Sequence, residues 1–339
     1  MKKSLLTFAT LAVVTFVPST VSAEEVVNLY SYRHYEADTE LYKKFTEKTG
    51  IKVNVVKSKA DALLERLASE SDSSKADLLI TSDAARLVKA KKLGLLQSAS
   101  SDDLLKQVPE NLRDPENHWY GITVRARVIV YNKDKVKAGE LKDYSDLTKP
   151  EWKGRVVARS SSNIYNQSLM AAMIANQGEK DALLWAMKVR KNMARKPQGS
   201  DRDQMRAVVA GVADAAIVNT YYIGLLANSE NEKDREVASK IAVCFPNQDS
   251  TGTHINISGA GICKHAPNKD NALKLLAFLT SPEAQSTFPQ TTSEFPLSMK
   301  SNSALLQSWG SFKADKLNLE KLGTNNAQAA KLFTAAKWE

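Results

Sequence analysis

Residues 26–56 read VVNLYSYRHYEADTELYKKFTEKTGIKVNVV, and this stretch decides the fold class. A β-type run over 26–32 is followed by a helical pattern over 38–49, which ends at Gly50. A second strand, with apolar residues at alternate positions, follows over 51–56. Strand, helix and strand in this order predict an α/β fold with a parallel sheet covered by helices.

The same alternation continues outward along the chain and then changes near Trp119. Further helices are predicted over 60–69, 84–92, 166–176, 179–192, 221–228 and 272–279, and further strands over 76–80, 120–131, 155–158 and 213–218. The long β-type runs around 120–130 and 241–263 are the candidates for crossing between two lobes. A cleft between lobes that are joined in this way is the expected ligand site.

The N-terminus has the pattern of a secretory signal peptide over residues 1–23. Lys2 and Lys3 precede an apolar stretch over 5–17, and small residues at Val21 and Ala23 stand before Glu24. The apolar stretch is shorter than the roughly 20 residues that a membrane-spanning helix needs. We therefore expect export to the periplasm, with a mature chain that begins at Glu24.

Charge and cysteine content narrow the range of partners. The chain carries 47 basic and 38 acidic residues, a net charge of +9, but the basic residues are scattered among acidic ones. A nucleic-acid-binding protein would gather them on one tract or face, so no nucleic-acid partner is expected. Cys244 and Cys263 are either a disulfide, which an oxidising compartment allows, or two buried thiols.

The sequence offers no enzymatic constellation. It contains no Gly-x-Ser-x-Gly, no His-Glu-x-x-His and no phosphate-binding P-loop, and its histidines at 34, 118, 254 and 265 are widely spread. An exported hydrolase would need an activated nucleophile, which no motif supplies. We therefore expect no enzyme and keep a hydrolase only as an alternative.

Tyrosines recur where a predicted strand meets a helix. Tyr32 and Tyr35 follow the first strand, Tyr165 follows the strand over 155–158, and Tyr221 and Tyr222 follow the strand over 213–218. Ligands of open α/β sheets bind outside the carboxyl ends of the strands, so these side chains are expected at the ligand site. Any one of these tyrosines taken alone is better explained by stacking on a sugar or an organic cation.

The joint set of tyrosines favours a hard metal ion. A phenol has a pKa near 10, and a trivalent cation favours the phenolate enough to displace the proton. Oxygen donors suit hard ions, whereas zinc or copper(I) would draw imidazole and thiolate. Three or four phenolates leave Fe³⁺ with a net charge of zero or −1, which Arg125 or Arg127 in the predicted crossing strand would offset.

Several segments resemble the periplasmic ferric-ion-binding proteins of bacterial ABC iron uptake systems, in particular the subgroup with a tyrosine cluster. The resemblance covers almost the whole mature chain, and its most specific parts are His34-Tyr35 and Asn219-Thr220-Tyr221-Tyr222. Glu294-Phe295-Pro296 resembles a Glu-Tyr-Pro signature of the family, with Phe in place of Tyr. The remaining matching segments are 29–35, 161–166, 215–222, 246–248, 252–261 and 279–283.

The resemblance implies a set of iron ligands. It points to Tyr35, Tyr165, Tyr221 and Tyr222, while His34 matches a position that some relatives use as a ligand and others leave unbound. Tyr32 is an additional tyrosine near the mouth of the site and is not expected to be a ligand. Arg125 matches an arginine that pairs with a tyrosinate or with a small synergistic anion such as carbonate.

The resemblance also implies the fold and the partners. The expected fold is a two-lobed periplasmic-binding-protein fold of class II type, with lobes over 24–123 with 248–298 and over 124–247 with 299–339. The expected function is capture of Fe³⁺ by a monomer and delivery to an inner-membrane ABC permease. The main alternative is a binding protein for a small anion without metal, which would use residues 160–163 and Arg125.

Overall fold

A computed structural model describes residues 24–33 and 35–339. The predicted signal peptide and His34 lie outside the described residues. Within the described part, no helix combines the length and the apolar character that crossing a membrane requires.

The N-terminal lobe is built around a five-stranded sheet in the order β2-β1-β3-β8-β4. Its first three strands are parallel, as the alternation of strands and helices predicts, whereas β8 runs antiparallel to both β3 and β4. These strands are β1 (Val26–Ser31), β2 (Lys52–Lys57), β3 (Leu78–Ser82), β4 (Tyr120–Asn132) and β8 (Ile255–Ile262).

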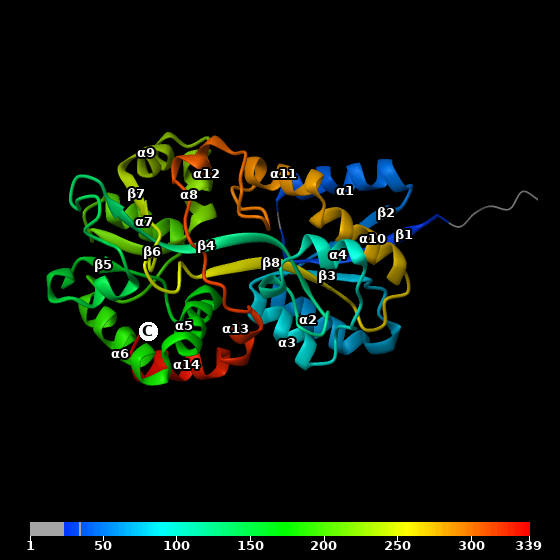
Figure 1. The fold of residues 1–339 in the computed structure, drawn as a ribbon, viewed down its shortest axis with the longest axis horizontal. Helices are drawn as coiled ribbons and strands as arrows, with labels where there is room; N and C mark the ends of the chain where they lie inside the picture. Colours follow the sequence, from blue (N-terminus) through cyan, green and yellow to red (C-terminus); the bar gives the residue numbers. More distant parts are fainter. Residues whose placement is uncertain (1–23, 34) are drawn as a thin grey trace, which may run out of the picture.

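Strand β4 leaves this sheet and continues into the sheet of the C-terminal lobe (Figure 1). Ala126 still pairs with Ile255 of β8, and the next residue, Arg127, pairs with Asn219 of β6. All 13 residues of β4 are buried. The second sheet contains β5 (Val156–Val157), β6 (Ala215–Asn219), β7 (Ile241–Cys244) and the end of β4.

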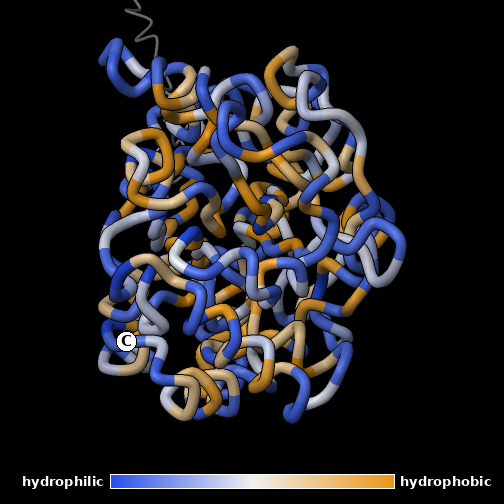
Figure 2. The backbone as a smooth tube through the Cα atoms, turned by 90° about the vertical axis from the view of Figure 1, so that its left-hand side faces the viewer, coloured by the Kyte–Doolittle hydropathy of each residue, from blue (hydrophilic) through white to orange (hydrophobic). Residues whose placement is uncertain are grey.

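Helices cover both sheets, and the buried apolar side chains form one continuous cluster that runs through both lobes. Large side chains such as Trp119, Trp152 and Trp338 are almost fully buried, and hydrophilic residues predominate in the peripheral loops (Figure 2). The helices around the first sheet are α1 (Glu36–Thr49), α2 (Ala60–Glu70), α3 (Ala84–Lys92), α4 (Asp102–Gln107), α10 (Lys269–Thr280) and α11 (Pro282–Thr291). The remaining helices are α5 (Ile164–Gln177), α6 (Glu179–Asn192), α7 (Asp201–Val209), α8 (Thr220–Ala227), α9 (Glu232–Lys240), α12 (Ala304–Ser308), α13 (Glu320–Thr324) and α14 (Asn326–Ala335).

The C-terminal segment contacts both lobes. Helix α13 packs against α3 on one side and α5 on the other. A Cβ added at Gly323 would lie 2.3 Å from the Cβ of Val88, so only a residue without a side chain allows α13 to approach α3 this closely. The amide of Leu319 donates to the carbonyl of Asn111 at 3.0 Å.

The two cysteines are free thiols, which resolves the alternative left open by the sequence. Cys244 pairs with Ile129 near one end of β4, whereas Cys263 follows Ala260, which pairs with Tyr120 at the other end. Nine residues of extended strand span roughly 30 Å, far more than the distance across a disulfide. The glycine-rich segment does not fold back on itself, because its second half is the straight strand β8.

Candidate metal centre

The candidate tyrosines lie in or immediately before the first turns of helices that follow strands. Tyr221 and Tyr222 lie in the first turn of α8, immediately after β6. Tyr165 lies in the first turn of α5, where the side chain of Asn163 accepts from its amide at 3.0 Å. Tyr35 is the residue before α1, after β1. These tyrosines therefore lie at the strand–helix junctions that the sequence predicts.

The phenol groups converge on one site. The hydroxyl of Tyr221 donates to the hydroxyl of Tyr165 at 3.4 Å. The rings of Tyr221 and Tyr222 lie 4.1 Å apart between centroids. The guanidinium of Arg125 lies 5.4 Å from the ring centroid of Tyr221 and 5.9 Å from that of Tyr165. Tyr35 is close enough to influence the pKa values of both Arg125 and Tyr221.

Burial makes these phenols weak acids in the absence of a cation. Desolvation, followed by the charge of Glu294, raises the pKa of Tyr35 well above its ordinary value. Desolvation, followed by Tyr165 and Tyr222, does the same to the pKa of Tyr221. Burial, followed by Tyr165 and Asp201, raises the pKa of Tyr222 to about 12. Burial is the largest of these effects and disfavours the phenolates of Tyr35, Tyr221 and Tyr222, whereas a cation that enters the site would favour them.

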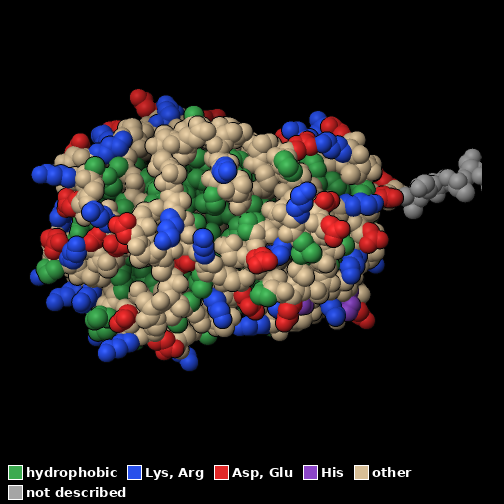
Figure 3. All heavy atoms as spheres, in the orientation of Figure 1, with side chains coloured by type: hydrophobic (Ala, Val, Ile, Leu, Met, Phe, Trp, Pro, Cys, Tyr) green, Lys and Arg blue, Asp and Glu red, His purple; other side chains and the backbone are tan. Residues whose placement is uncertain are grey.

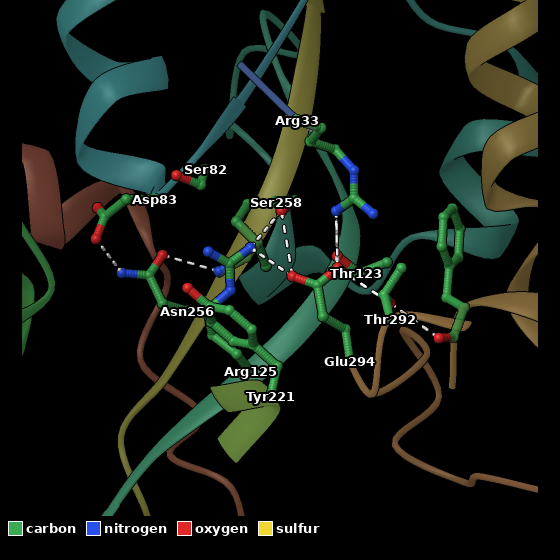
Figure 4. Close-up of polar contacts among 12 residues, drawn as sticks. Arg33, Ser82, Asp83, Thr123, Arg125, Tyr221, Asn256, Ser258, Thr292 and Glu294 are labelled. Carbon is green, nitrogen blue, oxygen red and sulfur yellow. Dashed lines mark hydrogen bonds and ion pairs between the residues drawn. The ribbon is translucent and has the colours of Figure 1, made fainter. Parts of the chain in front are cut away.

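A buried network of arginines around Glu294 forms the wall of the site (Figure 4). The carboxylate of Glu294 lies 2.7 Å from the guanidinium of Arg33 and 3.0 Å from that of Arg125. It also accepts from the hydroxyl of Thr123 at 2.9 Å. Burial alone would raise the pKa of Glu294, but the two arginines outweigh it and lower this pKa.

The sequence argument did not assign a role to Glu294 or Arg33, although it singled out the segment that contains Glu294. The signal was a carboxylate in an otherwise uncharged run over 285–299. Arg33 lies in sequence beside Tyr35, and its guanidinium stands 4.9 Å from that ring centroid. Arg33 and Glu294 therefore position the side chains of Tyr35 and Arg125.

Arg159 is a second cation beside the tyrosines that sequence reasoning missed. Its guanidinium lies 5.9 Å from the ring centroid of Tyr165, and its charge acts to lower the pKa of Tyr222, against the larger effect of burial. The Nε atoms of Arg125 and Arg159 are buried without a hydrogen-bond partner among the described residues. Unpartnered buried donors of this kind fit a small anion beside the metal.

Arg127, which the sequence argument paired with Arg125, has a different role. Its guanidinium lies 2.9 Å from the carboxylate of Asp201, and it donates to the side-chain oxygens of Asn166 and Asn219 at 2.6 and 3.0 Å. It therefore ties together the starts of α5 and α7 and the end of β6. Its contacts position the tyrosine-bearing turns.

Another carboxylate-rich group among the described residues, Asp114, Glu116 and His118, has donor atoms within 4.8 Å of one another. The amine of Lys91 lies 2.8 Å from Asp114 and 3.0 Å from Glu116. A cation is therefore already supplied by the chain, and this group is an ion-pair cluster on the N-terminal lobe.

Comparison with known proteins identifies the family. The family model described as "Bacterial extracellular solute-binding protein" matches residues 73–314. The chain belongs to this family. Iron uptake protein A1 of Synechocystis is 47% identical to this chain over 324 residues, which cover 95% of this chain and 90% of that protein.

Solved structures of solute-binding proteins share the two-lobed fold. A structure described as Trichodesmium IdiA (FutA) in complex with iron and citrate ligands has a TM-score of 0.90 and 47% identity, and the match covers 93% of this chain and 100% of that one. The ferric binding protein from Campylobacter jejuni has a TM-score of 0.85 and 46% identity, covering 91% of this chain and 99% of that one. The expected α/β two-lobed fold is confirmed.

Of the residues that the sequence proposed for the site, the structure brings Tyr35, Tyr165, Tyr221, Tyr222 and Arg125 into one neighbourhood. His34 lies outside the described residues. The ring of Tyr32 lies 5.1 Å from the guanidinium of Arg86, a cation of α3 that lies outside the Glu294 network.

Proposed function

We propose that this solute-binding protein captures Fe³⁺ in the periplasm and delivers it to an inner-membrane ABC permease, without catalytic turnover. The observation that carries the proposal is the meeting of tyrosines from three separate strand–helix junctions beside Arg125. The relatives named above as iron uptake and ferric binding proteins support the same cargo. We further propose a cleaved signal peptide over 1–23 and a monomeric chain.

The proposed ligands are the phenolate oxygens of Tyr35, Tyr165, Tyr221 and Tyr222, with His34 as a candidate fifth donor. Hard anionic oxygens are the donors that a hard trivalent cation prefers. Burial is the main reason that the pKa values of Tyr35, Tyr221 and Tyr222 are raised, and this does not oppose the role, because the charge of a bound cation favours the phenolate. Four phenolates give an iron centre of charge −1, and Arg125 offsets it.

A small synergistic anion such as carbonate fits the same site. The unpartnered Nε atoms of Arg125 and Arg159 would donate to it. A binding protein for a small anion without metal is the second candidate function, since those donors need no iron. The two candidates differ in the tyrosines, which only the iron protein requires.

Delivery requires that the site open and close. We propose that residues 24–123 and 248–298 form one lobe, that 124–247 and 299–339 form the other, and that β4 and β8 act as hinge strands between them. Tyr35 then comes from one lobe, and Tyr165, Tyr221 and Tyr222 come from the other. Iron in the cleft bridges the lobes, and the closed form is the one that a permease would recognise.

Absorption spectroscopy of the iron-loaded protein tests the proposal. Fe³⁺–phenolate pairs absorb visible light, so the wild-type protein should be coloured, and Phe in place of Tyr165, Tyr221 or Tyr222 should shift the band and weaken iron binding. Tyr32→Phe is the matched control and should change neither. An unchanged band and affinity in all three ligand variants, with anion binding retained without metal, would favour the second candidate.

A further inference from the structure

A separate cavity of about 550 Å³ opens on the C-terminal lobe. It lies between α5, α6, the 3₁₀ helix η3 (Tyr144–Thr148) and the loop that joins β7 to β8. None of the proposed iron ligands lines it. Its volume is within the roughly 300–1,000 Å³ of small-molecule sites, and the proposed function gives it no role.

The cavity concentrates negative charge on a chain of net charge +9. Lys188 is the basic residue among the side chains that line it. On the face of the C-terminal lobe in the left-hand half of Figure 3, acidic and basic side chains both lie around areas of apolar side chains. The carboxylates that line the cavity, none of which forms an ion pair with a described residue, are Asp143, Asp181, Asp249 and Asp315.

Asp315 is the deepest of these carboxylates. It is 7% exposed and accepts from the side-chain amide of Asn176 at 2.7 Å and from the backbone amide of Leu317 at 2.9 Å. These donors fix the carboxylate but supply no positive charge. A buried carboxylate that is held in place without a counter-ion is arranged to receive a cation.

His254 provides an independent sign of a ligand. Its side chain lines the cavity, is 4% exposed, and has no hydrogen-bond partner among the described residues. Burial, followed by the charge of Arg127, lowers its pKa to about 3, so the ring is neutral and offers an acceptor nitrogen. The ring nitrogens are not among the fully enclosed polar atoms that lack a partner in the described residues, so they are open to the cavity and available to a ligand.

The remaining walls are apolar and aromatic. Trp185 is anchored by a hydrogen bond from its indole nitrogen to the carbonyl of Tyr144 at 2.9 Å, and Leu184 beside it is 46% exposed. Leu169 and Met173 of α5 continue this wall. The cavity therefore suits a molecule that combines an aliphatic body with positively charged ends.

We propose that this cavity binds a small organic cation that carries alkylammonium or guanidinium groups. A bare metal ion fits less well, because the carboxylates and His254 do not form a group of three donors within 4.8 Å, the arrangement that Asp114, Glu116 and His118 have among the described residues. The carboxylates take the charged ends, and the ring of His254 accepts from one N–H.

The same chemistry is carried by a free polyamine and by an Arg or Lys side chain of a docking protein. Calorimetric titrations of the full mature protein with spermidine and with N-acetyl-arginine amide or N-acetyl-lysine amide separate these sources. Saturable binding of spermidine alone assigns the cavity to free polyamines. Binding of a capped amino acid alone assigns it to a partner's side chain, and binding of both supports the shared chemistry. Binding of none overturns the proposal.

Variants locate the binding. The double variant Asp143→Asn with Asp249→Asn removes two charges at the rim and should weaken spermidine binding about tenfold or more. Asp102→Asn with Asp103→Asn is the matched control, because it removes two exposed charges on α4 with the same change in net charge. It should leave binding within about twofold. Equal weakening by both pairs would show binding to overall charge only and would overturn the proposal.

Iron binding is the second control, since none of the tyrosines proposed as iron ligands lines the cavity. Both double variants should keep the visible band of the iron-loaded protein. Asp315→Asn tests the deep carboxylate, and retention of the band shows that the variant is folded. Loss of amine binding with an intact band supports the cavity, whereas undiminished amine binding in Asp315→Asn and in the rim variant contradicts it.

Discussion

A buried phenol holds its proton until a cation displaces it, and this makes iron capture depend on pH. The pKa values of Tyr35 and Tyr221 are raised well above the ordinary value, and that of Tyr222 is raised to about 12. Each phenolate that forms on binding therefore releases a proton at any pH below these values. We expect the iron affinity to fall by at least about tenfold per pH unit as the pH falls. Chelator competition between pH 8 and 5 measures it, and a flat profile would exclude phenolate ligation.

Glu294 is a residue whose loss should be strongly destabilising. It is fully buried and neutralises both Arg33 and Arg125. Glu294→Gln keeps the shape but leaves the guanidinium of Arg125 as a buried charge without a carboxylate. We expect a loss of about 3–5 kcal/mol in the free energy of unfolding, measured by denaturant titration.

An exposed glutamate gives the matched control for this measurement. Glu283 pairs with Lys48 at the surface, so Glu283→Gln should cost at most about 1 kcal/mol. Similar losses for the two variants would mean that the Glu294 network contributes little to folding.

At the scale of elements, a glycine sets how closely α8 approaches the segment that carries Glu294. A Cβ added at Gly224 would lie 2.2 Å from the Cβ of Ser293, and this contact is too short for any side chain. Gly224→Ala should therefore displace α8, destabilise the fold, and weaken iron binding through Tyr221 and Tyr222. Thermal unfolding and iron titration test both effects.

The compensating change provides the control. Ser293→Gly removes the opposing Cβ, and Ser293 has a φ of 56°, which glycine adopts without strain. The double variant should recover much of the lost stability and affinity, since the next neighbour of the added Cβ is 3.5 Å away. If the double variant does not recover stability and iron affinity, Gly224 acts through the flexibility of α8 and not through its close contact with Ser293.

What the sequence reveals depends on whether a feature is local. The strand–helix junctions are local patterns, so the order of residues alone places the tyrosines at them. The contact of Arg33 with Glu294 joins residues 261 positions apart, and no short pattern indicates it. For the same reason, the sequence could not show that Cys244 and Cys263 are free thiols. Only the course of β4 and β8 shows that the two cysteines lie far apart.

At the scale of the whole molecule, Asp83 holds the lobes together. Its carboxylate, at the start of α3, accepts from the hydroxyl of Ser168 in α5 at 2.8 and 2.9 Å and from the amide of Asn256 in β8 at 2.7 Å. Asn256 and Asp83 belong to the same sheet region, whereas α5 packs beside the second sheet. The bonds to Ser168 are thus among those that separation of the lobes would break.

Ser168→Ala should therefore shift the chain toward an open form. A hydrogen bond to a charged group contributes about 1.5–3 kcal/mol, and about 1.4 kcal/mol changes a population ratio tenfold. Small-angle scattering of the iron-free variant should give a larger radius of gyration than wild type, while Ser286→Ala, whose hydroxyl bonds within α11, should match wild type. Because iron contributes free energy only to the closed form, adding Fe³⁺ should compact both wild type and Ser168→Ala, and should compact Tyr35→Phe less. If the scattering of wild type is the same with and without iron, and Ser168→Ala does not differ from it, closure is not coupled to the metal and Asp83 is an anchor within a rigid molecule.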